Sequence, residues 1–179
     1  KRSDEIFMRK KILYFFQAII VYLFFLISKI IGLKLSRILF SFIFIKIGNL
    51  FRSKNKIYEN LEKICPDKSI LEKRVTIDKM WSNYGKTFTE YVYLNVFKKR
   101  TNHIKIKNKK IIDEIVQNNK QVVFISGHFS NFELMSMELT KAKVKLATIY
   151  RPLNNFFLNP FMEYIRKTFV CKHQIKKGL

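Results

Sequence analysis

The sequence predicts an α/β domain, with a mainly parallel sheet flanked by helices, preceded by an N-terminal helical anchor that crosses a membrane or lies in its interface. Three observations predict this class: a long uncharged run near the N-terminus, strand-like segments that alternate with helix-like ones after Arg100, and a run of β-branched residues that ends at a glycine. We assign residues 1–56 to the anchor and residues 57–179 to the N-terminal part of the α/β domain. The chain lacks an initial methionine and ends after a basic tail, so we expect it to be a fragment.

The anchor is predicted from the stretch between Ile12 and Ser28, where no charged residue occurs over 17 positions. Extended to Ile31, the stretch would form a helix roughly 30 Å long, which matches the thickness of a bilayer core. No small-residue cleavage site follows, as one would after a signal peptide. We therefore expect an uncleaved membrane anchor. The alternative is a core helix of a soluble bundle, although the run is apolar on every face.

A second apolar run, over 35–50, is interrupted by Arg37 and Lys46 and is too short between charges to span a membrane alone. It is expected to lie in the interface or to return as half of a hairpin. Basic residues flank the first run on both sides and are more numerous after it, so the positive-inside rule places the rest of the chain in the cytoplasm. The flanking residues are Lys1, Arg2, Arg9, Lys10 and Lys11 before the run and Lys29, Lys34, Arg37, Lys46, Arg52, Lys54 and Lys56 after it.

Two helices are expected next. Residues 57–64 predict a short helix that Cys65-Pro66 ends. Ser69 begins a longer helix, because Ser69-x-x-Glu72 has the spacing of a capping box. Apolar residues recur along this helix with a period of 3.6, which predicts a face packed in the core. These residues are Val75, Ile77, Trp81, Tyr84, Phe88, Tyr91 and Val92.

The remaining chain alternates between strand-like and helix-like patterns, which is typical of an α/β domain with a parallel sheet. The run QVVFIS is short, apolar and rich in β-branched residues, so we expect a strand buried on both faces. The tail Lys172–Lys177 is expected to be a solvated face. The expected strands are 103–107, 121–126 and 144–150, and the expected helices are 109–118, 130–140 and 156–169.

Charge and composition exclude several function classes. The net charge of +22 favours an acidic partner or an anionic surface, although part of it reflects a lysine-rich composition. Five glycines are too widely spaced to form a nucleotide-binding loop. Nothing in the sequence forms a helix-turn-helix or an RNA-recognition strand, so no nucleic-acid partner is expected. Cys171-x-His173 lacks a second ligand pair, and we expect neither a metal nor a cofactor.

The segment Gly127–Glu133 (GHFSNFE) directly follows the predicted buried strand. Ligands bind at the carboxyl ends of strands in open α/β sheets. His128 falls in the strand-to-helix turn, and Glu133 falls in the first turn of the next helix. A carboxylate beside the imidazole would hold its tautomer and stabilise the imidazolium that forms when it accepts a proton. The alternative is local, because Ser130-x-x-Glu133 is itself a capping box.

Three motifs in order, WSNYGKT at 81–87, GHFSNFE at 127–133 and YRPLNN at 150–155, resemble the bacterial lipid A biosynthesis acyltransferase family. The resemblance extends from about Trp81 to Arg166, and the N-terminal anchor also resembles that of the family. It implies transfer of an acyl chain from an acyl-carrier-protein thioester to a hydroxyl of a lipid A precursor, at the cytoplasmic face of the bacterial inner membrane.

The resemblance also implies roles for single residues. His128 matches the catalytic base of the family and Glu133 its acidic partner. Arg151 matches an arginine that engages phosphate or the thioester region. The other candidate substrate-binding residues are Asn131, which has no defined role, Tyr150 and Arg166. For Arg166, a plain exposed helix face is the alternative.

Two positions depart from the pattern of the family, which usually has Gly where Ser130 stands and Trp where Phe132 stands. The distal half, which in the family carries further substrate-binding elements, is also missing. A related alternative is acylation of a lysophospholipid or another glycolipid. An alternative of another class is a non-catalytic, basic, membrane-tethered binding protein.

Overall fold

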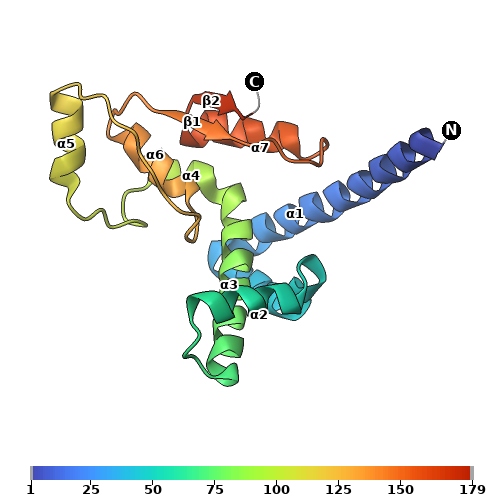
Figure 1. Cartoon of the computed structure of the whole chain (residues 1–179). Coiled ribbons are helices and arrows are strands. Elements are labelled where there is room, and N and C mark those ends of the chain that lie inside the picture. The colour runs from blue at the N-terminus through green and yellow to red at the C-terminus, as the bar shows by residue number, and fades with distance from the viewer. Residues whose placement is uncertain (1, 178–179) are drawn as a thin grey trace. The chain divides into compact units, whose positions relative to one another are not determined.

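The computed structural model describes residues 2–177, so Lys1 of the predicted basic flank and residues 178–179 lie outside the described residues. The described chain is mainly helical and contains two short strands (Figure 1). The α-helices are α1 (Arg2–Phe51), α2 (Lys54–Ile64), α3 (Ile70–Glu90), α4 (Leu94–Lys99), α5 (Lys109–Gln117), α6 (Glu133–Lys141) and α7 (Asn159–Ile165). The strands are β1 (Ala147–Tyr150) and β2 (His173–Lys176), and short helical turns cover Tyr91–Tyr93 and Arg166–Val170.

The chain forms two compact units. One, which we call the middle unit, comprises residues 27–92. The other, which we call the terminal unit, combines the chain up to Leu26 with the chain from Tyr93 onward. These units do not coincide with the two predicted domains, residues 1–56 and 57–179. That domain division stays a prediction.

Helix α1 contains both apolar runs of the sequence. Its backbone leaves the helical region at Gly32, where φ is 81° and ψ is 162°. Glycine adopts such a positive φ without steric cost, so this position interrupts the helix between the two runs. From Glu5 to Phe51, α1 is long and apolar enough to cross a bilayer, and few of its residues are buried by the rest of the protein. Length and composition are therefore compatible with membrane association.

The middle unit packs α2 and α3 around Ile57, Ile77 and Trp81, which are buried together. The predicted capping box at the start of α3 is confirmed. The Glu72 backbone N–H donates to Ser69 Oγ at 3.3 Å, and the Ser69 backbone N–H donates to Glu72 Oε2 at 2.9 Å. The predicted core face is correct only in part, because Val75 and Tyr84 are exposed.

Two glycines allow close approach within the middle unit. A Cβ atom at Gly85 of α3 would lie 2.2 Å from the backbone oxygen of Phe40, and one at Gly48 would lie 2.1 Å from the ring of Trp81. Near the first contact, Ser41 Oγ and Ser82 Oγ are hydrogen-bonded at 2.5 Å. The second part of α1 and α3 therefore pack backbone to backbone, a distance that only residues without a bulky side chain permit.

The predicted parallel sheet is present only in small part. β1 and β2 form a two-stranded parallel sheet in which Ile149 pairs with Ile175. The predicted strand at 144–150 is shortened to β1, and 103–107 and 121–126 are not strands. The run QVVFIS is exposed, with Val123 at 88% and Ile125 at 93% of full exposure. A strand buried on both faces needs a neighbouring strand to accept and donate its backbone hydrogen bonds. Among residues 2–177, β1 and β2 pair with each other, and the segment QVVFIS forms no strand.

The basic tail is largely exposed, as expected, but it also contains a strand that was not predicted. Residues 173–176 form β2, whose backbone pairs with β1 while most of its side chains are exposed. The predicted helix 156–169 is shorter, because α7 begins at Asn159 and gives way to the π-helical turn at Arg166. Figure 1 shows α7 beside the two strands and α5 projecting away from them within the terminal unit.

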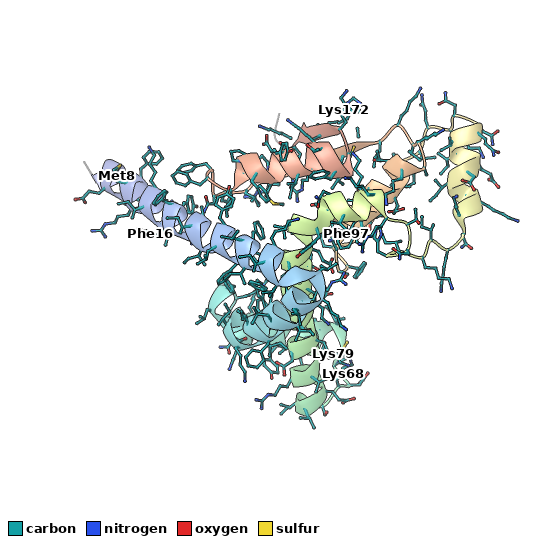
Figure 2. All side chains as sticks on the ribbon, turned by 180° about the vertical axis from the view of Figure 1, so that it is seen from behind. Met8, Phe16, Lys68, Lys79, Phe97 and Lys172 are labelled. Atoms are coloured by element: carbon teal, nitrogen blue, oxygen red, sulfur yellow. The ribbon has the colours of Figure 1, made fainter. Side chains whose placement is uncertain are left out.

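A polar contact joins α4 to α6 in the terminal unit. Lys141 Nζ donates to the backbone oxygens of Phe97 and Arg100, each at 2.8 Å, and lies 2.6 Å from Glu138 Oε1. His103, which falls in the expected strand 103–107, is not in a strand and stacks on Phe97 with ring centroids 4.9 Å apart. Figure 2 labels Phe97 in this part of the unit. The contacts fix the position of α6, whose first residue is Glu133.

Candidate active site

His128 and Glu133 occupy different environments at the start of α6. His128 is exposed in a segment without regular structure, and its ring packs edge-on against Phe132 with centroids 4.2 Å apart. Glu133 is the first residue of α6, and only 5% of it is exposed. Within the described chain, no hydrogen bond or ion pair joins His128 to Glu133. The structure therefore places the two residues of the motif near one end of α6 without coupling them.

Arg166 is the residue that binds Glu133. Its Nε donates to Glu133 Oε1 at 2.7 Å, and its Nη2 lies 2.6 Å from the same oxygen. The exposed fractions of the two side chains are 13% for Arg166 and 7% for Glu133. Hydrogen bonds between ions are strong when they are shielded from water. The alternative in which Arg166 lies on a plain exposed helix face is therefore wrong.

The capping-box alternative for Glu133 is wrong as well. The N-cap of α6 is Phe132, whose side chain makes no capping hydrogen bond. Glu133 is therefore the first helical residue, whereas a capping box places its Glu at the third. Ser130 has a φ of 52°, in the left-handed region where glycine has no steric cost. This backbone conformation gives a physical reason why glycine suits the position better than serine. Asn131, which follows, is buried, and its backbone oxygen accepts from the Leu134 N–H at 3.2 Å.

Tyr150 and Arg151 lie at the end of β1. Arg151 is exposed, whereas Tyr150 is buried and its hydroxyl donates to Glu163 Oε1 at 2.8 Å. Burial, followed by the hydrogen bond to Glu163 and the charge of that carboxylate, raises the pKa of the Tyr150 phenol. Tyr150 thus links the end of β1 to Glu163 of α7, whereas Arg151 is exposed to solvent.

Glu163 is a half-buried carboxylate, with several hydrogen-bond partners, that the sequence analysis missed. Besides Tyr150, it accepts from Asn159 Nδ2 at 2.9 Å, and Lys176 Nζ lies 3.3 Å away. The hydrogen bond from Tyr150, and then that from Asn159, lowers the pKa of Glu163. Asn159 Oδ1 also accepts from the backbone N–H of Leu153 at 2.9 Å. The spacing of Asn159 and Glu163, four residues apart on a helix, was the available sequence signal.

The described residues contain no cluster of metal-binding side chains. No three His, Cys, Asp or Glu side chains gather there as the ligands of an ion would. The polar groups that do converge are the Glu133–Arg166 pair at the start of α6 and the Tyr150–Glu163 pair at the end of β1. Both pairs belong to the terminal unit.

Comparison with known proteins identifies a family. The model of the family described as bacterial lipid A biosynthesis acyltransferase matches residues 7–177, nearly the whole chain. No curated protein and no solved structure matches. The matched range includes both the motif at 127–133 and the motif at 150–155.

Proposed function

This chain belongs to the bacterial lipid A biosynthesis acyltransferase family, and from that premise we propose that it moves a fatty acyl chain from an acyl-carrier-protein thioester to a hydroxyl of a lipid A precursor. The observation that carries the proposal is the family match over residues 7–177, which takes in the motif GHFSNFE. That motif presents an exposed imidazole, His128, just before a buried carboxylate, Glu133.

We assign His128 as the general base. It accepts the proton of the acceptor hydroxyl while the hydroxyl oxygen attacks the thioester carbonyl carbon. The carbon–sulfur bond then breaks, and the imidazolium returns the proton to the departing thiolate. A positioned base contributes roughly 10²–10⁴-fold to the rate of such a reaction. The exposure of His128 supports this role, because a bulky lipid hydroxyl must reach the imidazole.

Glu133 is the proposed acidic partner that stabilises the imidazolium. The arrangement requires the His128 side chain to turn from Phe132 toward the start of α6. The segment before α6 has no regular secondary structure, so this rotation breaks no helix or strand hydrogen bond. The hydrogen bond from Arg166 holds the orientation of the Glu133 carboxylate while His128 rotates.

Arg151 is the proposed substrate-binding cation. A guanidinium stays charged at all physiological pH values and binds two oxygens at once, which suits a phosphate of the acceptor or the developing oxyanion. Its exposed position after β1 supports this role. Tyr150 is proposed to hold the turn that presents Arg151, and Asn131 to shape the turn that presents His128.

We place the reaction at the cytoplasmic face of the bacterial inner membrane. Helix α1, long and apolar, supports membrane association. The net charge of +22 favours an acidic carrier protein and anionic headgroups, over a Debye length of about 8 Å at physiological salt. The substrate cannot leave the bilayer, so an anchored enzyme meets it by diffusion within the membrane.

The test is acyl transfer by the purified chain in detergent, from acyl-acyl-carrier protein to a lipid A precursor. His128→Ala and Glu133→Ala are each expected to lose activity, by about 10²-fold or more for the base. His173→Ala is the matched control, because His173 is exposed on β2. Undiminished turnover in both site variants refutes the assigned roles. Transfer to a lysophospholipid instead of the lipid A precursor refutes the assigned acceptor.

A further inference from the structure

The loop between β1 and α7, residues 151–158, packs on the first part of α1. The ring of Phe156 lies edge-on to Tyr14 with centroids 6.0 Å apart, and the ring of Phe157 lies edge-on to Phe15 at 5.5 Å. All of these residues belong to the terminal unit. We call this segment the aromatic loop.

Hydrogen bonds fix the same contact. Asn155 Nδ2 donates to the backbone oxygen of Tyr14 at 2.8 Å, and its Oδ1 accepts from the Phe157 N–H at 3.0 Å. The Tyr22 hydroxyl donates to the backbone oxygen of Phe157 at 2.9 Å. Further along, Phe161 of α7 packs against both Tyr22 and Phe25 of α1. The aromatic loop and α7 thus follow α1 over about three turns, or roughly 17 Å.

One face of α1 is covered by this contact and the others are open. Ala18 and Phe25 are buried, with Val21 half-buried between them, at the spacing of one helical stripe. Phe16 and Leu23, on the other faces, are more than half exposed. Figure 2 labels Met8 and Phe16 along this part of α1. The helix is apolar on all faces, but the rest of the protein covers only one of them.

A bilayer core cannot surround this part of α1. Irregular backbone does not occur in contact with lipid tails, because its N–H and C=O groups would lose their hydrogen bonds to water. The aromatic loop is irregular, and both Arg151 and Asn154 in it are exposed. If α1 crossed the membrane along Tyr14–Phe25, these groups would sit within the hydrocarbon.

We propose that the first part of α1 and the aromatic loop form a single membrane-binding surface, which enters one leaflet of an anionic bilayer without crossing it. The open apolar sides of α1 sink into the acyl chains, about 5–10 Å deep as in other interfacial helices. Phe156 is 43% exposed, Phe157 is 37% and Leu153 is 39%, so the loop adds apolar side chains next to the half-exposed Phe15.

Charge identifies the bilayer as anionic. Arg9, Lys10 and Lys11 are exposed at the start of the apolar run, where an anionic surface attracts their positive charges. Arg151 lies at the beginning of the aromatic loop, so binding of this surface would also hold Arg151 close to the lipid headgroups. The inference rests on the proposed membrane association and not on acyl transfer.

The first test measures binding of the whole chain to vesicles of phosphatidylethanolamine and phosphatidylglycerol, without acyl donor or acceptor. The double variant Phe156→Asp/Phe157→Asp is expected to bind about tenfold more weakly or worse, from the loss of two apolar rings. Ile111→Asp, on an exposed position of α5, is the matched control and is expected to bind like the wild type. Equal binding by the double variant and the wild type overturns the proposal. Circular dichroism verifies that each variant is folded.

The second test needs no disruptive substitution. Phe7→Cys, at an exposed position before the apolar run, is treated with a membrane-impermeant maleimide in intact spheroplasts and in lysed ones, and peptide mapping locates the label. The natural Cys65, which follows α1, is the internal control. Protection of both cysteines until lysis supports a helix that stays in one leaflet. Labelling of Phe7→Cys in intact spheroplasts, with Cys65 protected, shows a spanning helix and overturns the proposal, whatever the outcome for acyl transfer.

Discussion

Arg166 binds Glu133 through two nitrogens, Nε at 2.7 Å and Nη2 at 2.6 Å, both directed to Oε1. The pair connects the π-helical turn after α7 to the first residue of α6 across 33 positions of sequence. Because Glu133 is the last residue of the motif GHFSNFE, the contact gives Arg166 a defined place at the candidate site. It makes Arg166 a positioning residue for the carboxylate.

Removal of the guanidinium is expected to destabilise the fold. Arg166→Ala leaves a buried carboxylate without its partner, which costs about 3–5 kcal/mol in the free energy of unfolding. Denaturant unfolding measures this loss. Arg166→Ala/Glu133→Gln is expected to recover part of it, because the buried charge is then gone. Lys167→Ala, on the exposed neighbour, is the control, and an equal loss there contradicts the role of the pair.

Gly85→Ala is expected to destabilise the middle unit. The added Cβ would lie 2.2 Å from the backbone oxygen of Phe40, so α3 and α1 must separate locally. Overpacking of this kind costs about 1–3 kcal/mol. Thermal unfolding measures the effect, with Lys86→Ala at the exposed adjacent position as the reference. A Gly85→Ala chain as stable as Lys86→Ala would show that the two backbones do not meet at this point.

Glu163 predicts a dependence of stability on pH. Its pKa in the folded chain is lowered below the ordinary value of 4.5, mainly by the hydrogen bond from Tyr150. A lowered folded pKa stabilises the fold above 4.5, and that contribution disappears as the pH falls through the folded value. Glu163→Gln is therefore expected to be less stable than the wild type at neutral pH, with the difference shrinking below pH 4.5. A difference that is constant across this range excludes the proposed ionisation.

Asn155→Ala is expected to loosen the aromatic loop. The variant loses the donor to Tyr14 and the acceptor for the Phe157 N–H. A hydrogen bond contributes about 1 kcal/mol, so hydrogen exchange of the Phe157 amide is expected to rise roughly fivefold. Asn154→Ala, at the exposed adjacent position, is the control. Unchanged exchange in Asn155→Ala would mean that the ring contacts alone hold the loop.

Local features were predictable from the sequence where their partners are near in the chain. The capping box of Ser69 and Glu72 needs only three residues of separation, and it is present. The uncharged run predicts a helix by composition, and α1 contains it. The family resemblance depends on motifs in order, and the match over residues 7–177 confirms it.

Features that depend on distant partners were not predictable in the same way. QVVFIS has the composition of a buried strand, yet it is exposed and unpaired with β1 in the described chain. Residues 173–176 have the charge of a solvated tail and are largely exposed, but their charge does not reveal that their backbone pairs with β1. β-branched side chains favour extended backbone, but only a neighbouring edge turns that backbone into a sheet.

The sequence by itself determined the family, the helices with their own caps and apolar runs, and the motif that carries His128 and Glu133. The tertiary structure decided that Glu133 takes Arg166 as its partner, that Tyr150 and Asn159 share Glu163, and that the loop after β1 lies on α1. The physical reason is the range of the interactions. Caps and helical periods act within a few residues, whereas ion pairs, strand pairing and ring contacts form between segments that only the folded chain brings together.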